Sequence, residues 1–383
     1  MVGASSPASR SRPCGGAARR PLIGLLAGLS FGLANRVGAA PFAYIPTGLV
    51  KGAVTIIDTA TNTVSATVPF SSPPLGAAVS ADGQRVYVTR CLANNLSIID
   101  GATQMLTTSV AVGTCPFAVA LDPPGTRAYV SNHFDSTVSV VDTVTGAAIA
   151  TVGTDALFPT GLVVHPTGAR LYVGSEVGPL SVIDTASNTV ATTIPVGDVI
   201  IGVAINPAGT EVYATDFADG TLSVIDTAHD TLTTTVPVGA GAYGVAVHPD
   251  GSRVYVANNG DNTVSVLDAA TAAVIATVPV GEGPNGVALD PTGAHLYVAN
   301  GTSDSVSVID TATHLVVATV PVAPSPSVLG VFIAPGGGPQ RQAPAVQGDG
   351  CSSVPPHQIK PAAAVLWMSY AAMLLLRRVR VRR

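Results

Sequence analysis

The feature that most constrains this chain is an aspartate that returns at intervals of 42 residues. It occurs seven times, and a tyrosine precedes it at a nearly constant distance in every copy. A repeat of this length is a structural unit that needs neighbouring copies to bury its apolar faces. The aspartates are Asp58, Asp100, Asp142, Asp184, Asp226, Asp268 and Asp310, and the tyrosines are Tyr44, Tyr87, Tyr129, Tyr172, Tyr213, Tyr255 and Tyr297.

Each copy has the pattern of four short strands. In the copy at 286–322, turn-forming segments separate the runs GVALD, LYVAN, SVSVID and VVATVPV. Short runs rich in Val, Ile, Leu and Tyr between turns indicate β-strands. Four strands in about 40–45 residues are typical of one propeller blade. The sequence therefore predicts an all-β fold, a seven-bladed β-propeller of four-stranded blades.

The two ends of the repeat region predict how the ring closes. The first copy, residues 42–70, lacks a leading strand, and a spare strand follows the seventh copy at residues 330–337. We expect this C-terminal strand to complete the N-terminal blade. Such closure removes the free sheet edges at which chains aggregate.

The second strand of several copies carries a signature that resembles the YVTN family of β-propeller repeats. It stands as YVTR at 87–90, YVSN at 129–132, and YVAN at 255–258 and 297–300. The resemblance covers about residues 42–337 and implies the propeller fold. Similar propellers are found in surface-layer proteins, lactonases, streptogramin-type lyases and quinoprotein-associated proteins, so the function stays open.

The segments around the propeller predict export. Residues 1–39 combine arginines, a 13-residue apolar run and small residues, which is the layout of a secretory signal peptide. We place cleavage after Ala39 or Ala40. The propeller spans 40–337, and a flexible linker rich in Pro, Gly and Gln spans 338–360.

Residues 361–383 predict a short hydrophobic helix with a basic tail, which acts as a membrane anchor or sorting signal. The apolar run at 362–376 would form a helix of roughly 23 Å, a short membrane span. The arginines behind it predict a cytoplasmic C-terminus with the propeller outside. Cys351 ahead of the helix resembles the MYXO-CTERM type of bacterial sorting signal. This resemblance implies processing at Cys351 and localisation in the cell envelope or at the cell surface.

The charge of the propeller excludes nucleic acid as a partner. Residues 41–340 hold six basic side chains against 22 acidic ones. Such an acidic surface repels phosphate backbones. The predicted partners are an unidentified protein, a small molecule or a glycan, together with the membrane through the C-terminal helix.

The cysteines indicate an oxidising compartment. Cys14 lies in the signal peptide, which leaves Cys91 and Cys115 in the propeller. Cys91 ends the second strand of blade two, and Cys115 starts the first strand of blade three. Both therefore lie on the same side of one blade junction, and we predict a disulfide between them.

Departures from the repeat predict where a ligand would bind. They gather in blades two to four, on the face that holds the inter-blade links and the loops between second and third strands, and blade five adds Asp216 at the matching loop. In blade four the link at 152–161 is one residue longer, and the hairpin at 174–179 is one residue shorter. Ligands of propellers commonly enter the central funnel on such a face, whereas ordinary variation of loops is the alternative. The predicted pocket residues are His133, Phe134, Phe158, Glu176 and Asp216.

No motif of a known enzyme class is present, and we predict neither a cofactor nor a metal site. The predicted function is an exported, envelope-anchored propeller that serves as a non-catalytic binding or surface scaffold. One alternative is a lactonase- or lyase-like enzyme with His133 or Glu176 as the acid or base. Another is a periplasmic partner of a quinone- or haem-dependent redox enzyme. Clustered His, Arg and acidic side chains around the funnel would favour an enzyme, and a lining of Val, Ala and Ser would weigh against one.

Overall fold

The computed structural model describes residues 42–48, 51–330 and 332–333. The predicted signal peptide, linker, hydrophobic tail and Cys351 lie outside these residues. Within the described ranges, no helix is both long enough and apolar enough to cross a membrane.

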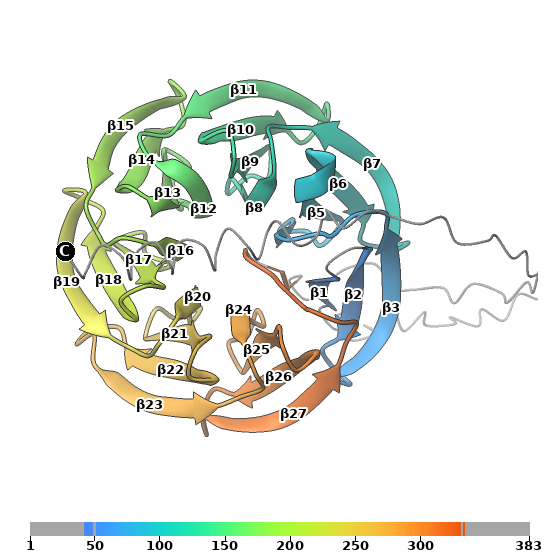
Figure 1. Ribbon diagram of the computed structural model, residues 1–383, viewed down its shortest axis with the longest axis vertical. Helices are drawn as coiled ribbons and strands as arrows, with labels where there is room; N and C mark the ends of the chain where they lie inside the picture. Colours follow the sequence, from blue (N-terminus) through green and yellow to red (C-terminus); the bar gives the residue numbers. More distant parts are fainter. Residues whose placement is uncertain (1–41, 49–50, 331, 334–383) are drawn as a thin grey trace, which may run out of the picture. The chain divides into compact units, whose positions relative to one another are not determined.

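Seven antiparallel sheets stand around a central axis and form a ring, which confirms the predicted seven-bladed propeller (Figure 1). Six sheets have four strands, and the first has three. In each complete blade the first strand lies nearest the axis and the fourth lies at the rim (Figure 1). A short 3-10 turn, η1 (Cys91–Ala93), stands between the second and third strands of blade two.

The strands follow the predicted runs. Blade one holds β1 (Phe42–Thr47), β2 (Gly52–Asp58) and β3 (Thr63–Phe70), and blade two holds β4 (Ala77–Val79), β5 (Arg85–Arg90), β6 (Asn95–Asp100) and β7 (Met105–Ala111). Blade three holds β8 (Pro116–Leu121), β9 (Arg127–Asn132), β10 (Thr137–Asp142) and β11 (Ala147–Gly153), and blade four holds β12 (Leu157–Val164), β13 (Arg170–Val177), β14 (Leu180–Asp184) and β15 (Thr189–Ile194). Blade five holds β16 (Ile200–Ile205), β17 (Glu211–Asp216), β18 (Thr221–Asp226) and β19 (Thr231–Pro237), and blade six holds β20 (Ala242–Val247), β21 (Arg253–Asn258), β22 (Thr263–Asp268) and β23 (Val274–Pro279). Blade seven holds β24 (Pro284–Leu289), β25 (His295–Asn300), β26 (Ser305–Asp310) and β27 (Leu315–Pro321).

The C-terminal segment pairs with the incomplete first blade. Ala43 of β1 forms an antiparallel bridge with Ile333, and the backbone N–H of Tyr44 donates to the carbonyl of Phe332 at 2.8 Å. The predicted closing strand at 330–337 is therefore in place at its described residues. The first and last segments of the described repeat region thus contribute to one blade, and the ring closes.

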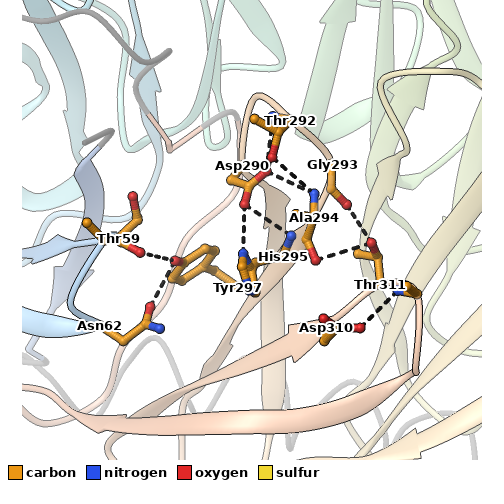
Figure 2. A network of polar contacts seen from close by, with 12 residues as sticks. Thr59, Asn62, Asp290, Thr292, Gly293, Ala294, His295, Tyr297, Asp310 and Thr311 are labelled. Carbon is orange, nitrogen blue, oxygen red and sulfur yellow. Dashed lines mark hydrogen bonds and ion pairs between the residues drawn. The ribbon is translucent and has the colours of Figure 1, made fainter. Parts of the chain in front are cut away.

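The repeated tyrosines join neighbouring blades. All seven tyrosine side chains are buried. Two of their hydroxyls, those of Tyr172 and Tyr297, donate to the next blade. Tyr172 of blade four donates to Oδ1 of Asp230 in blade five at 2.9 Å. At the ring closure, Tyr297 of blade seven donates to Oδ1 of Asn62 in blade one at 2.9 Å and contacts the carbonyl of Thr59 at 3.3 Å (Figure 2).

The repeated aspartates hold the turns between third and fourth strands. Asp310 shows the pattern, because its Oδ1 accepts the N–H groups of Ala312 and Thr313 and the hydroxyl of Thr313. These hydrogen bonds lower the pKa of the Asp310 carboxyl. The 42-residue repeat of Asp is therefore structural, as an Asx-type turn requires.

Inner strands of consecutive blades touch backbone to backbone at glycine. A Cβ on Gly202 would lie 2.3 Å from the carbonyl oxygen of Tyr243, and a Cβ on Gly244 would lie 2.2 Å from that of Asn285. The hydroxyl of Thr215 donates to the same Tyr243 carbonyl at 2.5 Å. Only glycine allows this approach, and it recurs around the axis at Gly76, Gly161, Gly202, Gly244, Gly286 and Gly330.

Blade four differs from the expected loop pattern. The segment 174–179, expected as a hairpin loop, is strand β13 up to Val177, and Gly178 and Pro179 make the turn. The expected link at 152–161 is shortened in the same way, because β12 begins at Leu157 and pairs with Val177. With the longer link and the shorter hairpin, strands β12 and β13 are both extended and pair up to Leu157 and Val177. Glu176 therefore lies in β13, past the position at which the second strand ends in other blades.

Candidate functional site

The ring encloses a central channel of about 570 Å³. Its walls are the inner strands β4, β8, β12, β16, β20 and β24, with Val328, Leu329, Gly330 and Ile333 from the closing segment. The lining residues are almost all Val, Ala, Leu, Ile, Gly and Pro. This volume lies within the range of roughly 300–1,000 Å³ that small-molecule sites occupy.

Two carboxylates stand at the end of the channel where first strands turn into second strands. Asp122 accepts the hydroxyl of Thr126 at 2.8 Å and the N–H of Arg127 at 2.9 Å. Asp290 accepts hydrogen bonds from residues 292, 294 and 295, including Nδ1 of His295 (Figure 2). Both carboxylates are engaged in turns, and they are the titratable side chains among the described lining residues.

An axial cluster of side chains borders the channel on the opposite side, where the inter-blade links run. Its members come from blades three, five and six and from the closing segment, so they meet across the axis. Ala118 and Leu329 belong to the axial cluster and also line the channel. The full axial cluster consists of Phe117, Ala118, Val199, Ile201, Phe217, Tyr243 and Leu329.

His133 packs on the outer side of this axial cluster. Its ring stacks on Phe117 with centroids 5.2 Å apart and an interplanar angle of 23°. The rings of Phe134 and Phe158 lie at the same centroid distance from His133. Nδ1 of His133 lies 3.3 Å from the carbonyl oxygen of Pro159, so Nδ1 carries a proton and Nε2 has a free lone pair. Burial lowers the pKa of this imidazole.

Glu176 faces the free nitrogen of His133. Its Oε1 lies 3.7 Å from Nε2, which is longer than a hydrogen bond. Burial raises the pKa of the Glu176 carboxyl to about 7. Burial, followed by the nearby Glu176 carboxylate, also raises the pKa of the Tyr243 phenol. Glu176 therefore lies near His133 and close enough to Tyr243 of the axial cluster to influence its phenol.

The pair has the electrostatics of an acid–base site. A carboxyl with a pKa near 7 exchanges protons at neutral pH, and a neutral imidazole beside it can accept one. A shift of under 1 Å would bring Oε1 and Nε2 into hydrogen-bond range. Phe134 is 51% exposed, so this group reaches the protein surface.

Four of the five predicted pocket residues are thus brought together, whereas Asp216 has a different role. Asp216 is 1% exposed, and its carboxylate accepts the backbone N–H groups of residues 198, 218 and 219. It caps its own loop and the link before it. None of the five predicted residues lines the central channel.

A disulfide joins Cys91 and Cys115 in the structure, with an S–S distance of 1.99 Å. The carbonyl of Cys115 accepts the backbone N–H of His133 at 3.0 Å, and that of Thr114 accepts the N–H of Phe134. The disulfide therefore supports the loop that presents the His133 side chain.

Sequence reasoning missed the axial cluster, although a signal for it exists. The residue just before the inner-strand glycine, which is Ala118 in blade three, varies from blade to blade, while the residues around it repeat. The position is occupied by Leu75, Phe117, Thr160, Ile201, Tyr243, Asn285 and Leu329. A varying residue inside a constant repeat points to a surface that the repeat itself does not specify.

Comparisons with known proteins show the fold. Residues 206–322 match the family model described as "Lactonase, 7-bladed beta-propeller", which is less than a third of the chain. A chain of Kuenenia stuttgartiensis hydrazine synthase is 23% identical with a TM-score of 0.64, over 76% of this chain and 99% of that one. A functionally unknown protein from Desulfotomaculum acetoxidans DSM 771 is 15% identical with a TM-score of 0.68, over 78% and 99%. No curated protein matches the sequence. The chain is a seven-bladed β-propeller that is similar, over blades five to seven, to the lactonase propellers.

Proposed function

We propose that this protein is an exported, envelope-anchored propeller that binds an apolar small molecule in its central channel without catalysing a reaction. The observation that carries the proposal is the channel lining. Val, Ala, Leu and Ile surround about 570 Å³, and the two carboxylates at the mouth are already engaged in turns. Such walls bind by removing apolar surface from water, at about 25 cal/mol per Å².

The export and anchoring parts of the proposal rest on the sequence. The arginine-bearing apolar segment in 1–39 and the apolar segment with arginines in 361–383 support them. The disulfide between Cys91 and Cys115 is compatible with an oxidising compartment.

A neutral fluorophore that brightens in apolar surroundings, N-phenyl-1-naphthylamine, tests the channel directly. We expect saturable binding to the full chain. Ala204 lines the channel, so Ala204→Trp should fill part of it and weaken binding at least about tenfold, the effect of losing roughly 1.4 kcal/mol. Ala148→Trp adds the same ring on the exposed strand β11 and should leave binding unchanged. Equal binding by both variants would place the probe elsewhere and refute the channel.

A lactonase-like enzyme is the second candidate, and two observations favour it. The family model matches blades five to seven, and His133 and Glu176 form a buried pair with the electrostatics of an acid and a base. The pair lies in blades three and four, outside the matched residues. Against this candidate, the channel itself offers no unengaged acid or base among the described residues.

Hydrolysis of a panel of lactones separates the two candidates. The binding proposal predicts no turnover above the uncatalysed rate. Turnover that disappears in Glu176→Gln and His133→Ala, and persists in the exposed control Glu282→Gln, would overturn the binding proposal in favour of the enzyme.

A further inference from the structure

Arg90 is a buried cation in an otherwise acidic propeller. It ends β5 on the side of the inter-blade links and is 8% exposed. Other blades place a small polar side chain at this position, such as Asn132, Asn258 and Asn300, which is buried and bonded within its own blade. Arg90 instead reaches out of its blade toward the link that follows β3.

The guanidinium is held on one edge only. Its Nε donates to the hydroxyl of Ser72 at 3.1 Å, and Nη2 donates to the hydroxyls of Ser71 at 2.8 Å and Ser72 at 2.9 Å. The guanidinium carbon lies 5.1 Å from the ring centroid of Phe70. Nη1 donates no hydrogen bond to any residue that the structure describes. The serine hydroxyls accept from Arg90, and their own protons donate to no acceptor among the described residues.

The other four arginines of the described propeller are placed differently. Each starts a second strand near an aspartate that closes the third strand of its blade. The pKa values of those aspartates are lowered, first by turn hydrogen bonds and also by the arginine. The pairs are Arg85 with Asp100, Arg127 with Asp142, Arg170 with Asp184 and Arg253 with Asp268.

Arg90 forms no ion pair within the described residues. Burial lowers the pKa of its guanidinium. A buried charge without a counter-charge is unfavourable, and an anion would relieve that cost.

We infer that Arg90, with the hydroxyls of Ser71 and Ser72, is a binding site for the carboxylate group of a ligand. The free Nη1 offers two N–H donors, and the two hydroxyls bound to Nε and Nη2 offer two more. The surrounding propeller has 22 acidic side chains against six basic ones between residues 41 and 340. Its field opposes multiply charged anions more than single ones, which favours a carboxylate over a phosphate.

Calorimetric titration of the full chain with sodium acetate and sodium propionate, in a low-chloride buffer, tests this site. We expect saturable binding of one carboxylate. Arg90→Met keeps the length of the side chain and removes its charge, so affinity should fall at least about tenfold, as the loss of a charged hydrogen bond implies. Arg127→Met removes an arginine of the repeated type and should bind acetate within about twofold of the native chain.

Three results would overturn the inference. They are the absence of saturable carboxylate binding, unchanged affinity in Arg90→Met, and tighter binding of phosphate than of acetate. If Arg90→Met fails to fold, the paired variants Arg90→Lys and Ser72→Ala decide the matter. Each keeps a positive charge at residue 90 and removes donors, so both should weaken acetate binding. If both variants bind acetate as tightly as the native chain does, the site is refuted.

Discussion

The Nε2 atom of His133 in blade three lies 3.7 Å from Oε1 of Glu176 in blade four, and burial has opposite effects on the two groups. It lowers the pKa of the imidazole and raises that of the carboxyl to about 7. Both groups are therefore favoured in their neutral forms. The free energy of unfolding should therefore depend on the pH at which these two groups titrate.

Glu176→Gln should remove part of the pH dependence of stability. The folded-state pKa of about 7 exceeds the ordinary value of 4.5, so the folded protein keeps a proton that the unfolded chain releases between those pH values. The contribution of Glu176 is present below about pH 4.5 and is lost as the pH rises through about 7. With 16% of the side chain exposed, the loss is on the order of 3 kcal/mol. Urea unfolding at pH 5 and pH 8 should show that the free energy of unfolding of the variant, relative to that of the native chain, is higher at pH 8 than at pH 5. An equal difference between the two proteins at both pH values would contradict the prediction.

Gly244→Ala should destabilise the ring strongly. The added Cβ would lie 2.2 Å from the backbone carbonyl oxygen of Asn285, which cannot move without displacing an inner strand. We expect a loss of about 1–3 kcal/mol or more in the free energy of unfolding, by analogy with overpacking of a dense core. Gly153→Ala is the matched control, because nothing lies within 4 Å of its added Cβ. Similar unfolding midpoints for the two variants would refute the backbone contact.

The disulfide between Cys91 and Cys115 should stabilise the chain by about 3 kcal/mol, because it closes a loop with a sequence separation of 24 residues. The double variant Cys91→Ala with Cys115→Ala should lose that amount in denaturant unfolding. A non-reducing peptide map of the native protein provides the direct check. Free thiols at both positions would disprove the bond.

Tyr297→Phe should weaken the closure between blades seven and one. The variant loses the hydrogen bond to Asn62 and the contact with the Thr59 carbonyl. Together these losses should lower the free energy of unfolding by about 1 kcal/mol. Tyr129→Phe is a control, since the described residues provide no hydrogen-bond partner for its hydroxyl. Equal effects of the two variants on thermal unfolding would show that the closure contact contributes nothing specific.

The candidate site was predictable only where the chain departs from its own repeat. His133, Phe134, Phe158 and Glu176 break the pattern of their blades, and the structure gathers them beside Phe117. Asp216 departs from the pattern as well, yet its carboxylate caps a loop. A departure in sequence therefore marks a local difference, and it does not reveal whether the side chain serves a ligand or its own backbone.

The sequence by itself determined the number of blades, their four-stranded pattern and the closure of the ring. These features follow from short-range chemistry that each copy repeats, namely Asx turns at residues such as Asp310 and short apolar strands between the turns. Only the tertiary structure decided what meets at the axis. Phe117, Ile201, Tyr243 and Leu329 come from distant parts of the chain, and their contact depends on how closely the inner strands approach. That approach is set by glycine-to-carbonyl packing between blades, so the channel and its apolar border emerge only when all seven blades close around them.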